Sequence, residues 1–294
     1  MKSRVPVLRV RGVTWQQSPE TLMFCGLLKD IELLVFDAYG YDEMLEYVVW
    51  PPELKTLVLG SSFVRSVDWL SWPKALEELT FRGAGFDQAI DKARWPATLK
   101  RLTFGSGFNQ PIDKVAWPAS LQQLTFGHGF DQPIENVTWR AAYFSLIHLT
   151  FGDKFNQPIT SKVRWPMSLQ GLKFGNSFNR EISGVVWPAT LRSLEFGRRF
   201  NQPVATIRWP AALRRLTFGT SFNQPLNKVE WPANLEELAV LTTGEKCANS
   251  LRVMVHWPIR LKKFTIGTRL GLGLVVLPPD VDVCRQESDG SDYF

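Results

Sequence analysis

Three histidines and three cysteines provide the side chains of this sequence best suited to acid–base chemistry, nucleophilic attack or metal binding. They stand far apart along the chain, at His128, His148, His256, Cys25, Cys247 and Cys284. None falls in the paired spacing of a zinc site or in the motif of a nucleophilic enzyme. The glycines recur at one phase of a repeat and precede no expected helix, so they predict turns and not a phosphate-binding loop. These patterns favour a protein that is not an enzyme, and they predict no catalytic residue, no metal and no cofactor.

The element that must position any binding group is a repeat of about 22 residues that is marked by tryptophan. Between Trp117 and Thr138 the unit reads W-P-A-S-L-Q-Q-L-T-F-G-H-G-F-D-Q-P-I-E-N-V-T, and it starts again at Trp139. Tryptophans in the same phase stand at positions 50, 72, 95, 117, 139, 165, 187, 209, 231 and 257. A fixed period of this length is typical of a solenoid, in which each coil buries its apolar face against its neighbours.

Two segments of each unit alternate apolar and polar residues, as a strand with one buried face does. In the unit above they are Leu124-Thr125-Phe126 and Val137-Thr138-Trp139. We therefore expect two short strands in every coil, stacked into two parallel sheets. Prolines interrupt each coil and exclude a long helix, because proline fixes φ and lacks an N–H donor. The predicted fold is mainly β, a parallel solenoid of about 11 turns of 22 residues with little helix.

Glycine and a column of asparagine and aspartate are predicted to form the bends of the coil. Gly127 follows the first strand, where we expect a backbone conformation closed to residues with a Cβ atom. The Asx column comprises Asn109, Asp131, Asn156, Asn179, Asn201 and Asn223. Short Asx side chains can hydrogen-bond the backbone at a tight bend. We therefore interpret this column as structural, in preference to a ligand-binding role.

The pattern L-x-x-L-x-F followed by G-x-x-F-N-Q-P-I resembles the FNIP repeat, a subfamily of the leucine-rich repeats. The string Phe-Asn-Gln-Pro begins at Phe108, Phe155, Phe200 and Phe222. The resemblance covers the chain from about Ile31 to about Pro279. The sequence departs from the family by placing tryptophan where the family usually has leucine before the proline. The resemblance implies a leucine-rich-repeat-like solenoid that acts as a protein-interaction scaffold. In that family such repeats are often joined to F-box or kinase domains, and we find neither in this sequence.

Departures from the repeat divide the chain into three predicted parts. Residues 1–26 lie outside the repeat and are expected to cap the first coil, because a solenoid must cover its open end. Residues 27–279 form the solenoid, and residues 280–294 are expected to form a mobile acidic tail. Within the solenoid, the pattern breaks at 140–146 and at 241–250. Each break is either a loop that the coil tolerates or a contact site for a partner.

Residue types change from coil to coil at the outward positions around the first strand. The residues there that we predict to bind a partner are Lys100, Arg101, Gln122, Gln123, His148, Lys173, Arg192, Glu195, Arg214, Arg215, Glu236 and Glu237. A constant core beside a changing surface suits a recognition scaffold, although a solvated face without a partner would show the same alternating charges. We expect a protein partner with an acidic patch, which the lysine and arginine residues would attract.

The alternative partner is a nucleic acid, bound through the arginine-rich segment 191–219. This segment contains Arg192, Arg198, Arg199, Arg208, Arg214 and Arg215, with Glu195 as its acidic residue. The arginines occupy different phases of the repeat, so we expect a belt around the coil. A phosphate backbone needs a continuous positive stripe instead. Protein is therefore the expected partner.

Charge and cysteine content indicate where the protein resides. The formal net charge of +6 is mild for 294 residues and does not select nucleic acid. We find no apolar run of the length of a signal peptide or a membrane span. The three cysteines are too scattered for a disulfide framework. We expect a protein of the cytoplasm or the nucleus without membrane association, and the sequence predicts no oligomeric state.

Overall fold

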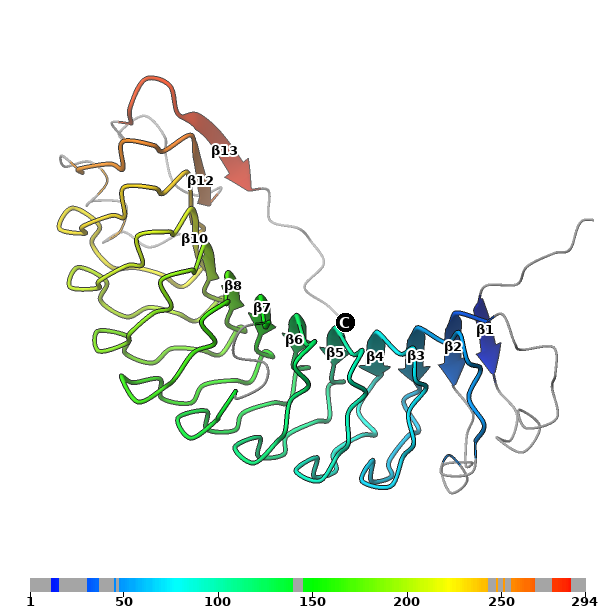
Figure 1. Cartoon of the computed structure of the whole chain (residues 1–294). Helices are drawn as coiled ribbons and strands as arrows, with labels where there is room; N and C mark the ends of the chain where they lie inside the picture. Colours follow the sequence, from blue (N-terminus) through cyan, green and yellow to red (C-terminus); the bar gives the residue numbers. More distant parts are fainter. Residues whose placement is uncertain are drawn as a thin grey trace, which may run out of the picture.

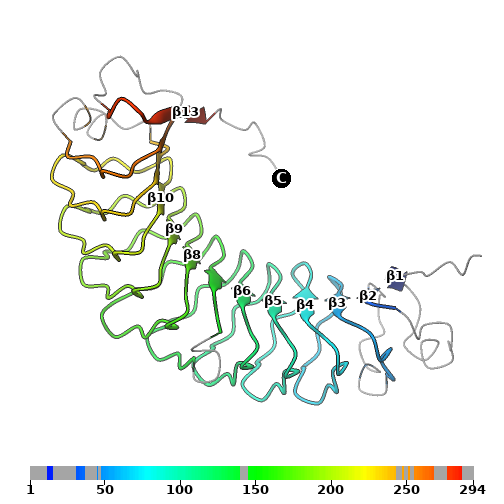
Figure 2. The same ribbon diagram turned by 45° about the horizontal axis from the view of Figure 1, so that its top comes forward.

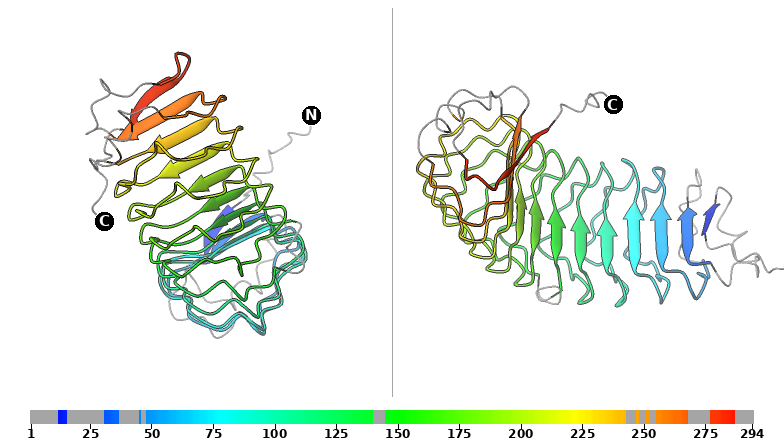
Figure 3. Two further views of the ribbon diagram at one scale, coloured as in Figure 1. Left: turned by 90° about the vertical axis from the view of Figure 1, so that its left-hand side faces the viewer. Right: turned by 90° about the horizontal axis from the view of Figure 1, so that it is seen from above.

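The structure, a computed structural model, describes residues 12–15, 31–36, 45, 48–139, 145–242, 247, 251, 255–267 and 277–286. Within these ranges thirteen strands form one sheet, in which each strand pairs with the next strand along the chain. The chain coils into an arc whose concave side is lined by the sheet, while the turns of each coil form the convex side (Figures 1 and 2). Seen from above, the strands lie side by side in one row (Figure 3).

The strands are three to five residues long and recur once in every coil. They are β1 (Gly12–Trp15), β2 (Leu33–Phe36), β3 (Thr56–Leu59), β4 (Glu78–Phe81), β5 (Arg101–Thr103), β6 (Gln123–Thr125), β7 (His148–Thr150), β8 (Gly171–Lys173), β9 (Ser193–Glu195), β10 (Arg215–Phe218), β11 (Glu237–Val240), β12 (Lys263–Gly267) and β13 (Asp282–Gln286). The predicted series of first strands, from Leu34 to Ile266, is confirmed by β2 to β12.

From β2 to β12, each strand buries its second residue, and most of the residues beside it face outward. Leu102, Leu124 and Leu149 are partners in the parallel ladder of β5, β6 and β7. Each of these leucines is 1% exposed, whereas the residues before and after it in the strand are half-buried or exposed. This alternation is the reason why the sheet has one core face and one face toward the concave side of the arc.

Two columns of phenylalanine fill the core behind the sheet. Phe104 and Phe108 of one coil stack on each other with ring centroids 4.1 Å apart. Phe104 then stacks on Phe126 of the next coil at 5.7 Å, and Phe108 stacks on Phe130 at 6.1 Å. Full burial of such a side chain stabilises the fold by roughly 1.5–3 kcal/mol relative to exposure. The phenylalanine columns therefore join successive coils into one continuous core.

The prediction of a second parallel sheet is wrong. Val137, Thr138 and Trp139 do alternate in burial, but they form no strand, and the coil closes through tight turns. Leu121 N donates to Pro118 O at 3.1 Å and Val137 N donates to Ile134 O at 3.2 Å. Together with a third turn, from Gly127 to Phe130, each regular coil consists of one strand and three turns.

The curvature of the arc explains why only one side of the coil forms a ladder. Parallel strands pair at a separation of about 4.8 Å. The spacing between equivalent rings of successive coils is 5.7 Å for Phe104 and Phe126, directly behind the strands. It widens to 6.2 Å for Trp117 and Trp139, which lie farther from the sheet. The wider spacing disfavours ladder hydrogen bonds beside the tryptophans, and the proline that follows most of these tryptophans lacks a donor.

The role predicted for Gly127 also needs correction. Among the described residues, Gly83 is the glycine with a positive φ, 70°. A Cβ atom on Gly127 would instead collide with the backbone carbonyl of Gly105 in the preceding coil. The same collision recurs along the column at Gly152, Gly175 and Gly219. Glycine is thus required here because successive coils approach closely, and not because of an unusual backbone angle.

The sheet extends beyond the boundaries that we expected for the solenoid. Strand β1 lies within residues 1–26, the predicted cap, and pairs in parallel with β2. Strand β13 lies within residues 280–294, the predicted mobile tail, and Val283 is in register with Phe264 of β12. The other residues of the predicted cap, and residues 140–144, 243–246, 248–250 and 287–294, lie outside the described part of the chain.

Candidate functional site

The twelve residues predicted to bind a partner all lie on the concave face of the sheet. They occupy three neighbouring columns, which are the residue before each strand, its first residue and its third residue. Arg101, Gln123 and His148 are ladder partners in the first-residue column. Lys173 and Glu195 are ladder partners in the third-residue column. The remaining predicted residues are Lys100, Gln122, Arg192, Arg214, Arg215, Glu236 and Glu237, and they continue these columns.

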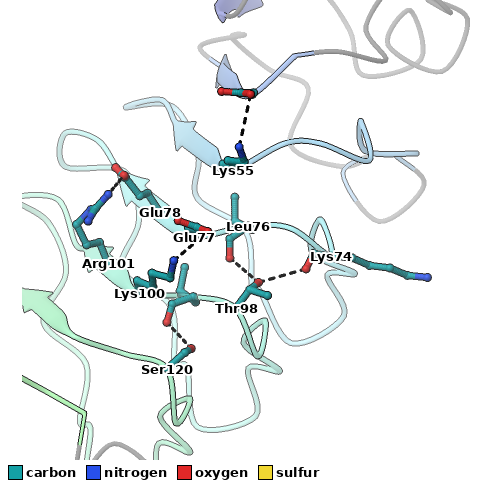
Figure 4. A network of polar contacts seen from close by, with 11 residues as sticks. Lys55, Lys74, Leu76, Glu77, Glu78, Thr98, Lys100, Arg101 and Ser120 are labelled. Carbon is teal, nitrogen blue, oxygen red and sulfur yellow. Dashed lines mark hydrogen bonds and ion pairs between the residues drawn. The ribbon is translucent and has the colours of Figure 1, made fainter.

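Ion pairs link neighbouring coils in the N-terminal half of this face. Lys100 Nζ lies 3.0 Å from Glu77 Oε1, and Arg101 pairs with Glu78 (Figure 4). The hydrogen bond from Lys100 lowers the pKa of Glu77 below its ordinary value of 4.5. These pairs are solvent-exposed, so they contribute little to stability. Their main effect is to neutralise most of the charge on β4 and β5.

The C-terminal half contains both paired and unpaired charges. Lys173 Nζ lies 2.6 Å from Glu195 Oε1, and Arg214 lies 3.5 Å from Glu236. Among the residues that the structure describes, Arg192 and Arg215 form no ion pair, and both are exposed. The cationic groups that remain available to a partner on this half of the face therefore include Arg192, Arg215 and Lys263, the first residue of β12.

A neutral strip separates the two charged halves at β6 and β7. It is formed by Gln122, Gln123, Thr125, Ile147 and His148. Its side chains offer hydrogen-bonding groups and one apolar contact without a fixed charge at neutral pH. Such a strip can be desolvated at a lower cost than the charged strands on either side of it.

Gly171 shapes the face next to this strip. It is the first residue of β8, in register with His148 and Ser193. A Cβ atom on Gly171 would collide with Nδ1 of His148, so the imidazole ring lies over β8. Gly171 is itself buried. The sequence signal for this feature was a lone glycine among larger residues in the column, and our sequence analysis did not use it.

A hollow of about 290 Å³ opens at the ends of β7, β8 and β9. The polar side chains in its wall are those of His128, Thr150, Asp153, Lys173, Asn176 and Glu195. His128 Nδ1 lies 3.3 Å from Asp153 Oδ2, and Asn176 Nδ2 donates to Asp153 Oδ1 at 3.0 Å. The sequence analysis assigned Lys173 and Glu195 to the binding face. It missed His128, Asp153 and Asn176, because their proximity depends on contacts between coils.

The Asx column is structural, as predicted, but its partner is the next coil and not its own bend. Asn109 Oδ1 accepts a hydrogen bond from the N–H of Asp131 at 2.8 Å. Gln132 Nε2 donates to the carbonyl oxygen of Asn109 at 2.9 Å. Equivalent bonds continue along the column until Asn223 Oδ1 accepts from the N–H of Cys247 at 3.1 Å. These side-chain oxygens hold successive coils together and so are committed to the backbone.

The arginines of residues 191–219 lie on different sides of the coil. Arg192, Arg214 and Arg215 belong to the concave face, whereas Arg199 lies in the turn after Gly197. Arg208 lines a separate hollow beside Trp209, away from the sheet. This arrangement is the predicted belt, and these arginines do not form a continuous stripe.

The other residues considered for chemistry do not assemble into a reactive site. The Cys247 thiol is buried, and burial raises its pKa to about 12. No group of three or more histidine, cysteine, aspartate or glutamate side chains is placed to hold a metal ion within the described ranges. In the same ranges no helix is long and apolar enough to cross a membrane.

Comparison with protein families identifies the repeat. The model described as FNIP Repeat matches residues 86–129, 108–137 and 165–199. The chain therefore carries FNIP repeats in the central and most regular part of the solenoid. No curated protein matches the sequence.

The solved structures that are similar to this chain include leucine-rich-repeat proteins. CroV588, described as a novel circular LRR protein, is 25% identical with a TM-score of 0.40, over 87% of this chain and 49% of that protein. This chain thus spans about half the length of CroV588. An internalin, inlF, from Listeria monocytogenes is 12% identical with a TM-score of 0.48, over 88% of this chain and 77% of the internalin.

Proposed function

We propose that this chain, a parallel solenoid with FNIP repeats, is a non-catalytic scaffold that holds a protein partner on its concave face. The observation that carries the proposal is the contrast between the two sides of the sheet. Behind the sheet, leucine, phenylalanine and Asx residues repeat almost unchanged from coil to coil. On the concave face, the ladder places Glu78, Arg101, Gln123 and His148 in consecutive coils. A constant core with a varied face provides a rigid surface with an individual pattern.

Charge on this face favours a partner with an acidic patch opposite β9 and β10. Arg192 and Arg215 have no internal counter-ion among the described residues, so they retain their attraction for an acidic surface. Lys100 and Arg101, which we also assigned to the partner, are each paired with a glutamate and contribute less. Exposed charges of this kind mainly accelerate association and select among partners. The neutral strip on β6 and β7 would form the centre of the contact.

The scattered positions of the three cysteines along the chain support a reducing compartment, the cytoplasm or the nucleus. Cys247 and Cys284 form no disulfide within the described ranges. Disulfides are rare in these compartments and common in secreted proteins.

Affinity capture with matched charge variants tests the proposal. The bait is the full chain, either unchanged, or with Arg192→Glu and Arg215→Glu on the concave face, or with Arg94→Glu and Arg164→Glu on exposed convex positions. Each bait is incubated with lysate of the source cell at low and high salt, with and without nuclease. We expect a discrete protein, unaffected by nuclease, that binds the unchanged and the convex baits and is lost from the concave bait.

Two outcomes would contradict the proposal. Equal capture by all three baits would show that Arg192 and Arg215 on the concave face do not bind the partner. Recovery of nucleic acid that is released by high salt would indicate that the arginine belt binds phosphates, and would favour the alternative partner.

A further inference from the structure

The hollow at the ends of β7, β8 and β9 has a size and position that suit one side chain of a bound partner. Its volume of about 290 Å³ lies at the lower end of the range for ligand pockets, about 300–1,000 Å³. Thr150, Lys173 and Glu195 belong both to the hollow and to the third-residue column of the concave face. A partner seated on the face would therefore cover the hollow.

The wall of the hollow contains more acidic than permanently basic groups. Besides His128, it carries one positive group, Lys173, and two carboxylates, Asp153 and Glu195. Both oxygens of Asp153 are occupied by His128 and Asn176. Glu195 uses Oε1 for Lys173, and its other oxygen has no partner among the described residues. A ligand with positive charge and N–H donors fits this balance better than an anion does.

The floor of the hollow presents backbone carbonyl groups as well as the N–H groups of Gly152, Gly175 and Gly197. The carbonyl groups belong to Phe126, Phe151 and Phe174, whose side chains are buried in the core. Nearer the N-terminal end of the sheet, the equivalent carbonyl of Leu59 accepts a hydrogen bond from the N–H of Arg82 at 2.7 Å. Within the described ranges, the carbonyl groups of the three phenylalanines accept no hydrogen bond. A partner side chain with N–H donors can bond these carbonyl groups.

We infer that this hollow receives one basic side chain, an arginine or a lysine, from the protein partner. The inference rests on the proposed function, since it assumes a protein on the concave face. The partner would then have two features, an acidic patch opposite Arg192 and Arg215 and a basic side chain opposite Glu195.

Titration with short peptides tests the inference without knowledge of the partner. The full chain, labelled with ¹⁵N, is titrated with acetyl-Gly-Arg-Gly-amide and with the citrulline peptide of the same shape, which has no charge. We expect saturable shifts of the amide signals of Gly152, Gly175 and Gly197 with the arginine peptide. Its affinity should exceed that of the citrulline peptide by about tenfold or more, because a charge-assisted hydrogen bond is lost in the latter.

A pair of variants assigns the binding to the hollow. Glu195→Gln should weaken binding of the arginine peptide by about tenfold, while Glu230→Gln, an exposed position away from the sheet, should leave it unchanged. The exposed pair with Lys173 contributes little to stability, so the melting temperature of Glu195→Gln checks that the fold is intact. Equal affinity for the two peptides, or no effect of Glu195→Gln, would overturn the inference.

The outcome is separable from that of the capture experiment. If the Arg192→Glu and Arg215→Glu bait loses its partner while the arginine peptide fails to bind, the concave face remains the binding surface. The hollow then does not receive a basic side chain. If all baits capture equally, the proposed function fails whatever the peptide does.

Discussion

The side chain of Asn201 bridges two coils by accepting a hydrogen bond from the backbone N–H of Asn223 at 2.8 Å. Gln224 Nε2 donates to the same Asn201 oxygen at 2.9 Å, so one amide oxygen receives two donors from the next coil. This pair is one step of a column that runs from Asp87 to the N–H of Cys247. The F-N-Q string thus holds successive coils in register through side-chain hydrogen bonds.

Replacing Asn201 should break one step of this column. Asn201→Ala leaves the N–H of Asn223 and one donor of Gln224 without their acceptor. We expect a loss of about 1–3 kcal/mol in the free energy of unfolding, measured by urea denaturation. Asn201→Asp is the matched control, because aspartate performs the same role at Asp131 and should be close to neutral. An Asn201→Ala variant as stable as the unchanged protein would exclude the column as a source of stability.

The tryptophan column should be part of the core. Trp187 is 7% exposed and stacks on Trp165 with ring centroids 6.2 Å apart. Trp187→Ala should lower the free energy of unfolding by roughly 3–5 kcal/mol. Its indole N–H is buried and has no partner in the described ranges. Because Trp187→Phe keeps an aromatic ring and removes this unpaired donor, it should lower the free energy of unfolding clearly less than Trp187→Ala does. If Trp187→Phe cost as much as Trp187→Ala, the indole N–H would have a partner after all.

Alanine variants of two glycines should separate the effect of close packing between coils from the effect of backbone flexibility. Gly127→Ala would place a Cβ atom against the carbonyl of Gly105, and we expect it to destabilise the fold by more than 1 kcal/mol, on the order of an overpacked core. Gly184 has nothing within 4 Å of its Cβ position, so Gly184→Ala should be neutral or stabilising by about 0.4–1 kcal/mol. Thermal and urea denaturation of both variants provides the comparison. Equal destabilisation by the two would indicate a general loss of flexibility.

The pair between Glu77 and Lys100 should be visible as a pH dependence. Because folding lowers the pKa of Glu77, this group contributes stability above its ordinary value of 4.5, and the contribution is lost as pH falls through the folded pKa. An NMR titration of the Glu77 carboxyl carbon measures the folded pKa directly. Lys100→Ala should raise it toward 4.5, whereas Lys114→Ala, on an exposed turn of the convex side, should not change it. An unchanged Glu77 pKa in Lys100→Ala would contradict this ion pair.

The sequence predicted the first strand of each coil, but it did not predict the curvature of the stacked coils. Leu124 and Phe126 alternate around a polar residue and occupy a strand, as predicted. Trp139 follows the same alternation without forming a strand, because burial is periodic there while the wider spacing of the coils disfavours a ladder. That spacing depends on the curvature of the whole stack, which no single repeat contains.

On the concave face, the sequence likewise predicted where residues lie but not which of them are in contact between coils. The period placed Arg192 and Arg214 on one face, since equivalent positions of a solenoid share a side. Which cations remain unpaired could not be predicted, because Lys173 and Glu195 are 22 positions apart and meet only through the register of β8 and β9. The collision between a Gly171 side chain and His148 likewise depends on register and on a rotamer.

The central claim is that the concave face binds a protein, and it is tested most directly by affinity once the captured partner is in hand. Calorimetry would compare the unchanged chain, the Arg192→Glu and Arg215→Glu variant, and the convex Arg94→Glu and Arg164→Glu variant at two salt concentrations. We predict that the concave variant weakens binding by about tenfold or more and reduces the salt dependence, because its arginines face an acidic patch. The convex variant should bind as the unchanged chain does. Equal Kd values for the concave variant and the unchanged chain would contradict the account.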